Sequence, residues 1–296
     1  DPETPDPALV QLVGPPSAAG LTKPQGGQKY THGHALILSG AAGHTGAARL
    51  AARAALRVGA GLVTLGGPQD ALAEVSAQIT ALMVTIVPNP EVLGELLSDT
   101  RLNALCLGPG LGISAHTRSL VSTVLPLKRP VVLDADALTV FQGMPDDLFV
   151  LLHENVVLTP HGGEFARLFP DLAKSLSAKP VSGPAYSKVN AVRAAAERAG
   201  CTVLLKGADT VIAAPDGRCS IHSARYDRAA PWLATAGSGD VLAGLVTGLM
   251  ARGQSALSAC EIAAWLHTEC AMQFGPGLIA EDIAEQLPLV LKKLGL

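Results

Sequence analysis

The residues Gly237, Ser238, Gly239 and Asp240 have the composition of an anion-binding turn. Apolar residues with helical spacing follow at positions 241, 242, 245 and 249, so a helix is expected over 240–251. Backbone N–H groups at the start of a helix, together with the positive end of its dipole, bind anions such as phosphate. We therefore predict that Gly237, Ser238 and Gly239 form an anion hole.

The carboxylate of Asp240 has no use as a phosphate ligand, because like charges repel. Beside an anion site it can instead act as a general base, taking a proton from a hydroxyl group that attacks the phosphate. The alternative is that Ser238 or Asp240 only caps the helix. The pattern Gly-x-Gly-Asp alone does not decide between these interpretations, so the rest of the chain has to be considered.

Composition limits the classes of protein to which the chain can belong. Its 296 residues are within reach of one large α/β domain, and 48% of them are hydrophobic, which is ample for a core. The net charge of −3 and the absence of a basic run make nucleic acid an unexpected partner.

Cysteine usage and hydropathy indicate the compartment. The five cysteines are an odd number, widely scattered and without a C-x-x-C pair, so neither a disulfide framework nor a zinc cluster is expected. The uncharged stretch 75–90 contains two prolines and is not expected to span a membrane, and no signal peptide is visible. These features predict a cytoplasmic protein with no membrane partner and no metal ligands of its own.

Residues 1–28 are rich in Pro, Gly and Ser and have weak periodicity. They are expected to be a flexible linker or a fragment of a preceding domain. We place a single domain over residues 29–296, since no further boundary follows.

Strand-like apolar runs alternate with helical patterns along this domain. Strands are expected at 34–38, 62–65, 82–87, 104–107, 131–133, 156–158 and 202–205. Helices are expected at 46–58, 70–77, 91–98, 115–125 and 186–199, and, after a hairpin of strands 210–214 and 219–222, at 240–251, 257–274 and 279–293. This alternation predicts an α/β fold with a mostly parallel central sheet and helices on both faces.

Clusters of small and polar residues stand where the predicted strands end. They occupy 39–47, 108–112, 134–136, 159–164 and 206–210. Ligands of open α/β sheets bind at the carboxyl ends of strands, so clusters that converge there favour a phosphate-bearing ligand. Neither the G-x-G-x-x-G pattern with its acidic partner nor the Walker A pattern is present, so the nucleotide is expected to be held by another scheme.

Single residues within these clusters allow two interpretations each. Lys206 ends an apolar strand, where lysines often only extend their amines to solvent, but it could meet a phosphate as a point charge. His161 could cap a turn or contact substrate. Asp134 and Asp136 could be capping residues or could contact a ribose or a metal. The histidines at 32, 34, 44, 116, 153, 222 and 267 have no ligand spacing and are expected to be incidental.

From about residue 29 onward, the chain resembles the ADP/ATP-dependent NAD(P)H-hydrate dehydratases of the ribokinase-like superfamily. The resemblance rests on six stretches in the family's order: HGHALILSGAAGHTGAARLAARAALRVGAGLVT (32–64), LGPGLG (107–112), PVVLDADAL (130–138), VVLTPHGGEF (156–165), LLKGADTVIAAPDG (204–217) and LATAGSGDVLAG (233–244). TPHGGE and KGADT are specific to the family, whereas AGSGD alone marks only the superfamily. Many members have Thr where this chain has Ser238, which keeps the hydroxyl. The segment 223–231 departs from the family's pattern, since it lacks the Asn/Gly-rich character that is common there.

The resemblance implies a reaction and its residues. The S form of hydrated NADH or NADPH would be dehydrated with ADP or ATP as co-substrate, aided by Mg²⁺, through phosphorylation of the C6 hydroxyl and elimination of phosphate. Asp240 would be the base. The hydrated coenzyme would contact Ala47, Gly110, His161 and Asp240, and the adenine nucleotide would contact Lys206, Gly207, Ala208, Asp209, Thr210 and Gly239.

The resemblance also bears on partners and on competing functions. Some family members carry an epimerase domain ahead of the dehydratase, so an epimerase domain or partner is expected. A homo-oligomer is expected too, with the alanine-rich helix 46–58 as one interface. The alternatives are a small-molecule kinase of the same superfamily, which would leave a stable phosphorylated product, and a non-catalytic nucleotide sensor, which would bind without turnover.

Overall fold

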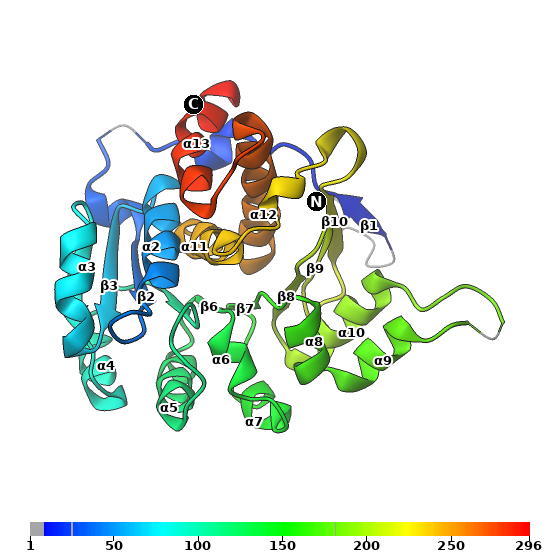
Figure 1. Cartoon of the computed structure of the whole chain (residues 1–296), viewed down its shortest axis with the longest axis horizontal. Coiled ribbons are helices and arrows are strands. Elements are labelled where there is room, and N and C mark those ends of the chain that lie inside the picture. Colours follow the sequence, from blue (N-terminus) through cyan, green and yellow to red (C-terminus); the bar gives the residue numbers. More distant parts are fainter. Residues whose placement is uncertain (1–8, 25, 181) are drawn as a thin grey trace.

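A computed structural model describes residues 9–24, 26–180 and 182–296 (Figure 1). Within them the strands form one sheet in the order β1-β10-β9-β8-β7-β6-β5-β2-β3-β4. The strands are β1 (Val10–Leu12), β2 (His34–Leu38), β3 (Leu62–Gly67), β4 (Met83–Ile86), β5 (Ala104–Leu107), β6 (Val131–Leu133), β7 (Val156–Leu158), β8 (Thr202–Leu205), β9 (Asp209–Ala213) and β10 (Cys219–Ser223). All neighbouring pairs are parallel except β8–β9 and β9–β10, which confirms the predicted sheet.

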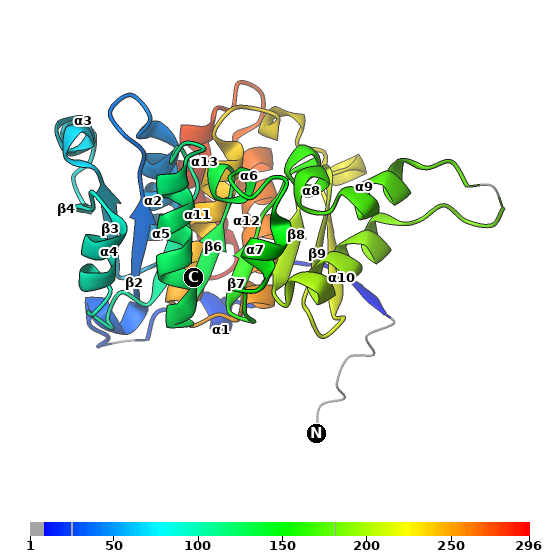
Figure 2. The ribbon, with the colours of Figure 1, turned by 90° about the horizontal axis from the view of Figure 1, so that it is seen from below.

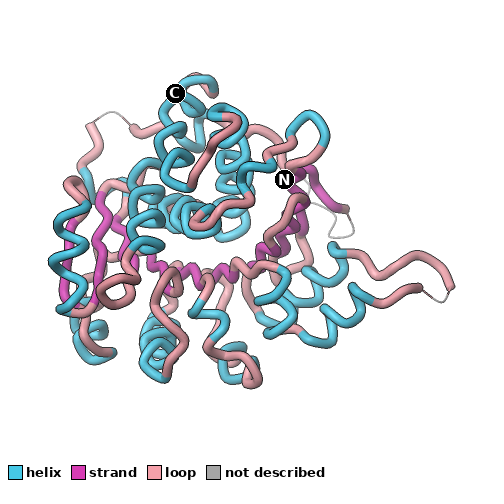
Figure 3. Tube along the Cα trace, in the orientation of Figure 1, coloured by secondary structure: helices cyan, strands magenta, loops and turns pink. Residues whose placement is uncertain are grey.

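Helices cover both faces of this sheet, as predicted (Figures 1 and 3). One face carries α2 (Gly46–Arg57), α11 (Ser238–Ala251), α12 (Ala256–Phe274) and α13 (Ala280–Lys293). The other carries α4 (Pro90–Leu96), α5 (Ala115–Val124), α6 (Asp136–Thr139), α7 (Pro145–Phe149), α8 (Gly162–Leu168), α9 (Pro170–Ser177) and α10 (Lys188–Ala199). The helix α3 (Leu72–Gln78) packs beside the edge formed by β3 and β4. Because β2 and β5 to β8 are buried at every position, side chains of both orientations have to be apolar, which explains the continuous apolar runs.

The helices α6 to α9 were not predicted from the sequence. They have 4 to 8 residues each, which is too short for a helical period to stand out from a loop. Their burial against the sheet, as for Phe165 and Phe169, stabilises them in place of length.

The amino-terminal segment differs from the expected linker where the structure describes it. Strand β1 pairs in parallel with β10, and the short helix α1 (Ala18–Leu21) buries Leu21 in the core. Residues 1–8 and 25 lie outside the described residues, and the division of the chain at residue 29 stays a prediction.

The alanine-rich helix α2 packs inside the molecule against α11. Its residues Ala51 and Ala55 are fully buried, and a Cβ at Gly244 of α11 would lie 2.1 Å from the carbonyl oxygen of Ala51. Small residues on both helices permit this close contact. The buried alanines of this helix are therefore not available as an oligomer interface, because another part of the chain covers them. An interface at the outer side of helix 46–58 stays a prediction.

Parallel pairing places the carboxyl ends of β2 to β8 at one edge of the sheet. The loops that follow these strands gather at the upper edge in Figure 2. The start of α11 and the loop 224–237 reach the same edge, so the clusters predicted from the sequence do converge.

Candidate active site

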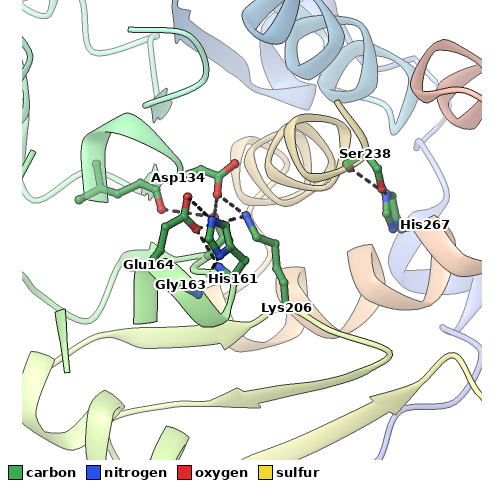
Figure 4. Close-up of polar contacts among 9 residues, drawn as sticks. Asp134, His161, Gly163, Glu164, Lys206, Ser238 and His267 are labelled. Atoms are coloured by element: carbon green, nitrogen blue, oxygen red, sulfur yellow. Dashed lines mark hydrogen bonds and ion pairs between the residues drawn. The ribbon is translucent and has the colours of Figure 1, made fainter. Parts of the chain in front are cut away.

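An ion-pair cluster centred on Lys206 lies at this edge (Figure 4). The Lys206 amine at the end of β8 is 2.6 Å from Asp134 Oδ1 after β6 and 3.8 Å from Glu164 Oε2 on α8. Asp134 also accepts a hydrogen bond of 2.9 Å from the Thr159 hydroxyl after β7. Three neighbouring strands thus each contribute one member, which is why residues 72 positions apart meet.

The lysine of this cluster is held in its charged form. Burial opposes the charge, but the carboxylates of Asp134 and Glu164 outweigh that effect and raise the pKa of Lys206 above its ordinary value. A charged amine that is largely buried and already paired is not extending to solvent. The structure thus argues against a lysine that only extends to solvent, and the contact of Lys206 with a phosphate stays a prediction.

His161 is the N-cap of α8, and it also faces the site. Its Nδ1 accepts a 2.9 Å hydrogen bond from the Gly163 amide, and its own amide donates to Glu164 Oε2 at 2.8 Å. This reciprocal arrangement is a capping box. His161 can therefore act as a cap and still contact a substrate, because its ring remains exposed while it caps the helix.

Helix α11 begins two residues earlier than predicted, at Ser238. Gly237 is its N-cap with φ 85°, a left-handed conformation that disfavours residues with a side chain. The first amides of the helix have no acceptor within it. A Cβ at Gly239 would lie 3.4 Å from the Lys206 amine, so the predicted anion hole and the predicted cation adjoin.

The amino terminus of α2 offers a contrast. The Glu74 carboxylate of α3 accepts a 2.6 Å hydrogen bond from the Gly43 amide and another from the Thr45 hydroxyl. A carboxylate of the protein itself is thus hydrogen-bonded to the loop before α2. Neither helix has a side-chain cap on its own first turn. The carboxylate that is hydrogen-bonded to the loop before α2 would repel an anion there, which favours α11 as the phosphate-binding terminus.

Asp240 stands in the first turn of α11 among the other charged groups. Burial raises the pKa of its carboxyl to about 6, Asp134 adds to the rise, and Lys206 opposes it. A carboxylate with a pKa near 6 is ionised at neutral pH and is a better proton acceptor than an ordinary aspartate.

A cavity of about 780 Å³ opens beside this cluster, between β9, β10, α11, α12 and the loop 224–237. Its lining combines six alanines with ten polar or charged side chains, three of which are histidines. Among the residues predicted to bind nucleotide or phosphate, it includes Lys206, Gly207, Ala208, Thr210, Ser238 and Gly239, and it includes His161. A pocket of this size with mostly apolar walls fits a nucleotide base and ribose.

Five predicted site residues lie outside that lining: Asp209, Gly237, Asp240, Ala47 and Gly110. Asp209 pairs with Arg225 at 2.6 Å and accepts from the Ser223 hydroxyl at 2.7 Å, so it supports the wall from behind. Gly110 has φ 71°, and a Cβ there would lie 3.7 Å from Ala47 Cβ and 2.4 Å from the His44 carbonyl. Ala47 and Gly110 therefore adjoin each other, in a place separate from the cavity.

Sequence reasoning missed several residues of the site. His222 and His267, expected to be incidental, both line the cavity, and burial lowers the pKa of each to about 4. Glu164 was quoted only as part of a motif. The sequence did contain a signal for these two histidines. Each lies within an apolar run, and a histidine within a buried strand or helix is itself buried.

No group of three or more His, Cys, Asp or Glu side chains in the described ranges is placed to hold a metal ion. The carboxylates of Asp134 and Glu164 offer oxygen donors at the cluster. Mg²⁺ usually keeps several waters and binds one or two carboxylates together with substrate phosphates. The donor set fits a magnesium ion that arrives with a nucleotide.

Comparison with known proteins agrees with this geometry. The profile described as NAD(P)H-hydrate dehydratase matches residues 35–288. The chain belongs to this family. It is 36% identical over 280 residues to a bifunctional NAD(P)H-hydrate repair enzyme of Salinibacter ruber, covering 88% of this chain and 48% of the relative. The chain thus spans about half the length of the curated relatives it matches.

Solved structures agree with the fold. A ribokinase-like superfamily protein of Enterococcus faecalis superposes with a TM-score of 0.77 at 23% identity, covering 94% of this chain and 95% of that one. An ADP/ATP-dependent NAD(P)H-hydrate dehydratase of Bacillus subtilis, co-crystallized with ATP/Mg²⁺, superposes with a TM-score of 0.73 at 26% identity, covering 92% and 94%. The fold of this chain is ribokinase-like. No helix in the described part of the chain is both long and apolar enough to cross a bilayer.

Proposed function

We propose that this chain dehydrates the S form of hydrated NADH or NADPH with ADP or ATP as co-substrate. The observation that carries the proposal is Asp240, a carboxylate with its pKa raised to about 6 in the first turn of α11. It stands next to the phosphate-binding turn. Family membership supplies the substrate and the co-substrate.

The proposed chemistry uses the residues already described. The nucleotide occupies the cavity, with its terminal phosphoryl group at the first turn of α11 and near the Lys206 amine. Asp240 takes the proton of the C6 hydroxyl as that oxygen attacks the phosphorus, and the nucleotide leaves with one phosphate fewer. The C6–O bond then breaks, inorganic phosphate leaves, and loss of a proton from C5 restores the ring double bond.

Positioning and charge stabilisation would supply most of the rate. Lys206 and the amides of Ser238 and Gly239 would stabilise charge on the phosphoryl oxygens. Asp134 and Glu164 would orient Lys206 and, through waters, hold Mg²⁺, which when bound neutralises phosphate charge. Ala47, Gly110 and His161 would contact the hydrated coenzyme, and Asp209 would support the nucleotide wall through Arg225.

The direct test mixes the protein with hydrated NADH, ADP and Mg²⁺ and follows the absorbance of reduced nicotinamide. We expect absorbance to return together with one inorganic phosphate per coenzyme. A stable phosphorylated coenzyme would instead support the kinase alternative. Nucleotide binding without any turnover would support a sensor.

The partners and the compartment are part of the same proposal. All five cysteines are free and buried, as in a protein of a reducing compartment, and we propose a cytoplasmic location. The curated relatives are bifunctional, so we propose that an epimerase domain or partner works with this chain. Homo-oligomerisation stays a prediction, and the buried alanines of α2 take no part in any such interface.

A further inference from the structure

His267 contacts Ser238, the first residue of α11 and the middle residue of the predicted anion hole. It lies on α12, and its Nε2 is 2.9 Å from the carbonyl oxygen of Ser238 and 3.3 Å from the Ser238 hydroxyl oxygen. Figure 4 shows this pair apart from the cluster around Lys206. Both residues are largely buried and both line the cavity.

The chemistry of the partners determines which ring nitrogen carries the proton. A carbonyl oxygen only accepts hydrogen bonds, so Nε2 has to carry a hydrogen and donate it. Burial lowers the pKa of His267 to about 4, so the ring is neutral at physiological pH. The same N–H points toward the Ser238 hydroxyl oxygen, which then acts as the acceptor in that contact.

A hydroxyl that accepts from His267 has its own hydrogen free for another partner. Serine hydroxyls in a helix otherwise tend to donate to nearby backbone carbonyls. Ser238 stands in the first turn of α11 and lines the cavity. A nucleotide bound there as proposed would present a phosphoryl oxygen as the acceptor for this hydroxyl.

We propose that His267 is a positioning residue that keeps the Ser238 hydroxyl as a hydrogen-bond donor to a phosphoryl oxygen of the bound nucleotide. The proposal rests on the proposed function, because it takes the nucleotide as the occupant of the cavity. It assigns His267 a part in nucleotide binding and phosphoryl transfer, although the residue does not touch the reacting atoms.

The test is a double-mutant cycle that measures ADP affinity by calorimetry and, separately, kcat and the KM for ADP. We expect His267→Leu and Ser238→Ala each to weaken ADP binding about 3- to 10-fold, the value of one hydrogen bond. The double variant should be no weaker than Ser238→Ala alone, because His267 acts through that hydroxyl. His267→Gln, which keeps a side-chain N–H donor, should recover most of the affinity.

His34 provides a matched control. It is as buried as His267, at 7% exposure, and its Nε2 likewise lies 2.7 Å from a hydroxyl, that of Thr64. It stands at the start of β2, at the opposite edge of the sheet. His34→Leu should lower thermal stability and leave ADP affinity and KM unchanged.

Several outcomes would overturn the inference. They are additive losses in the double variant, an unaltered ADP affinity in His267→Leu, or no recovery with Gln. If His267→Leu does not fold, His267→Ala takes its place in the same cycle with Ser238→Ala. A wild-type protein that binds ADP but does not dehydrate hydrated NADH refutes the proposed function alone, since the affinity cycle still applies. A wild-type protein that binds neither ADP nor ATP refutes both.

Discussion

At the scale of single residues, the site is defined by three carboxylates that share one lysine. Asp134 and Glu164 pair with Lys206 directly, which leaves Asp240 as the carboxylate whose charge is least compensated. Burial and Asp134 then raise its pKa to about 6. The same environment that makes Asp240 a useful base also makes its ionised form costly to the folded protein.

Asp240→Asn should therefore lower activity and raise stability. Loss of a general base costs about 10²–10⁴-fold in rate. In the folded protein the pKa of Asp240 is higher than the ordinary 3.8, so ionisation of this carboxyl lowers the stability of the wild type. The loss of stability is absent below about pH 4, where the carboxyl is protonated in both states, and complete above about pH 6. The variant should gain about 1–3 kcal/mol at neutral pH and nothing at acid pH. Denaturant unfolding at several pH values checks this, and wild-type kcat/KM should fall below pH 6.

Two bulky substitutions should separate the two substrates. Ala47→Leu should raise the KM for hydrated NADH and leave ADP affinity unchanged, because Ala47 lies outside the cavity.

Gly239→Val should weaken ADP binding, because its side chain would crowd the Lys206 amine, 3.4 Å from the Cβ position. Gly239 has no positive φ, so bulk rather than backbone strain is the cause. Each variant is the control for the other, and a shared loss of both affinities would contradict the separation.

At the scale of elements, the start of α11 is held in place by how closely the helix packs on α2. A Cβ at Gly244 would lie 2.1 Å from the Ala51 carbonyl oxygen, a backbone atom that cannot move aside. The helix that begins with the predicted anion hole is therefore placed by its close packing against α2.

Gly244→Ala should lower the free energy of unfolding by about 2 kcal/mol or more, since the added methyl overlaps the backbone of α2. Gly94→Ala is the matched control, because Gly94 also lies within a helix but its Cβ would have only the Thr123 methyl at 4.0 Å. That change should stabilise by about 0.5–1 kcal/mol through helix propensity. Chemical denaturation measures both, and equal effects at the two sites would show that packing does not matter at Gly244.

At the scale of the whole molecule, the far ends of the elements are tied together opposite the site. Arg252, just after α11, donates hydrogen bonds to the Val58 carbonyl at 2.9 Å and to the Leu21 carbonyl at 2.5 Å. One partly buried guanidinium thereby joins the ends of α11 and α2 to the amino-terminal segment.

Arg252→Ala should cost about 2–3 kcal/mol of stability, because charged hydrogen bonds to buried carbonyls are lost. The activity of the folded protein at low temperature should persist, as the residue is at the opposite edge from the cavity. Arg101→Ala, which removes an exposed ion pair with Asp99, should leave the free energy of unfolding nearly unchanged. A large activity loss in Arg252→Ala below its melting temperature would contradict a purely structural role.

Local patterns in the chain determined most of the architecture. The apolar runs predicted the central strands and the long helices within a few residues, since burial on both faces leaves a signal in neighbouring positions. Small residues after the strands marked the edge where the ligand site forms. The turn at Gly237 and the proposed base Asp240 were recognisable for the same reason, because the pattern Gly-x-Gly-Asp is contiguous in the chain.

Only the tertiary structure decided which distant groups meet. Lys206 and Asp134 are 72 residues apart, and Ser238 and His267 are 29 apart, so no local spacing records either pair. The structure also shows that His161 caps α8 and that α11 begins at Ser238. It covered the alanine face of α2 with α11. The physical reason is common to all of these: contacts across strands and between packed helices depend on strand order and helix approach, which the three-dimensional packing sets.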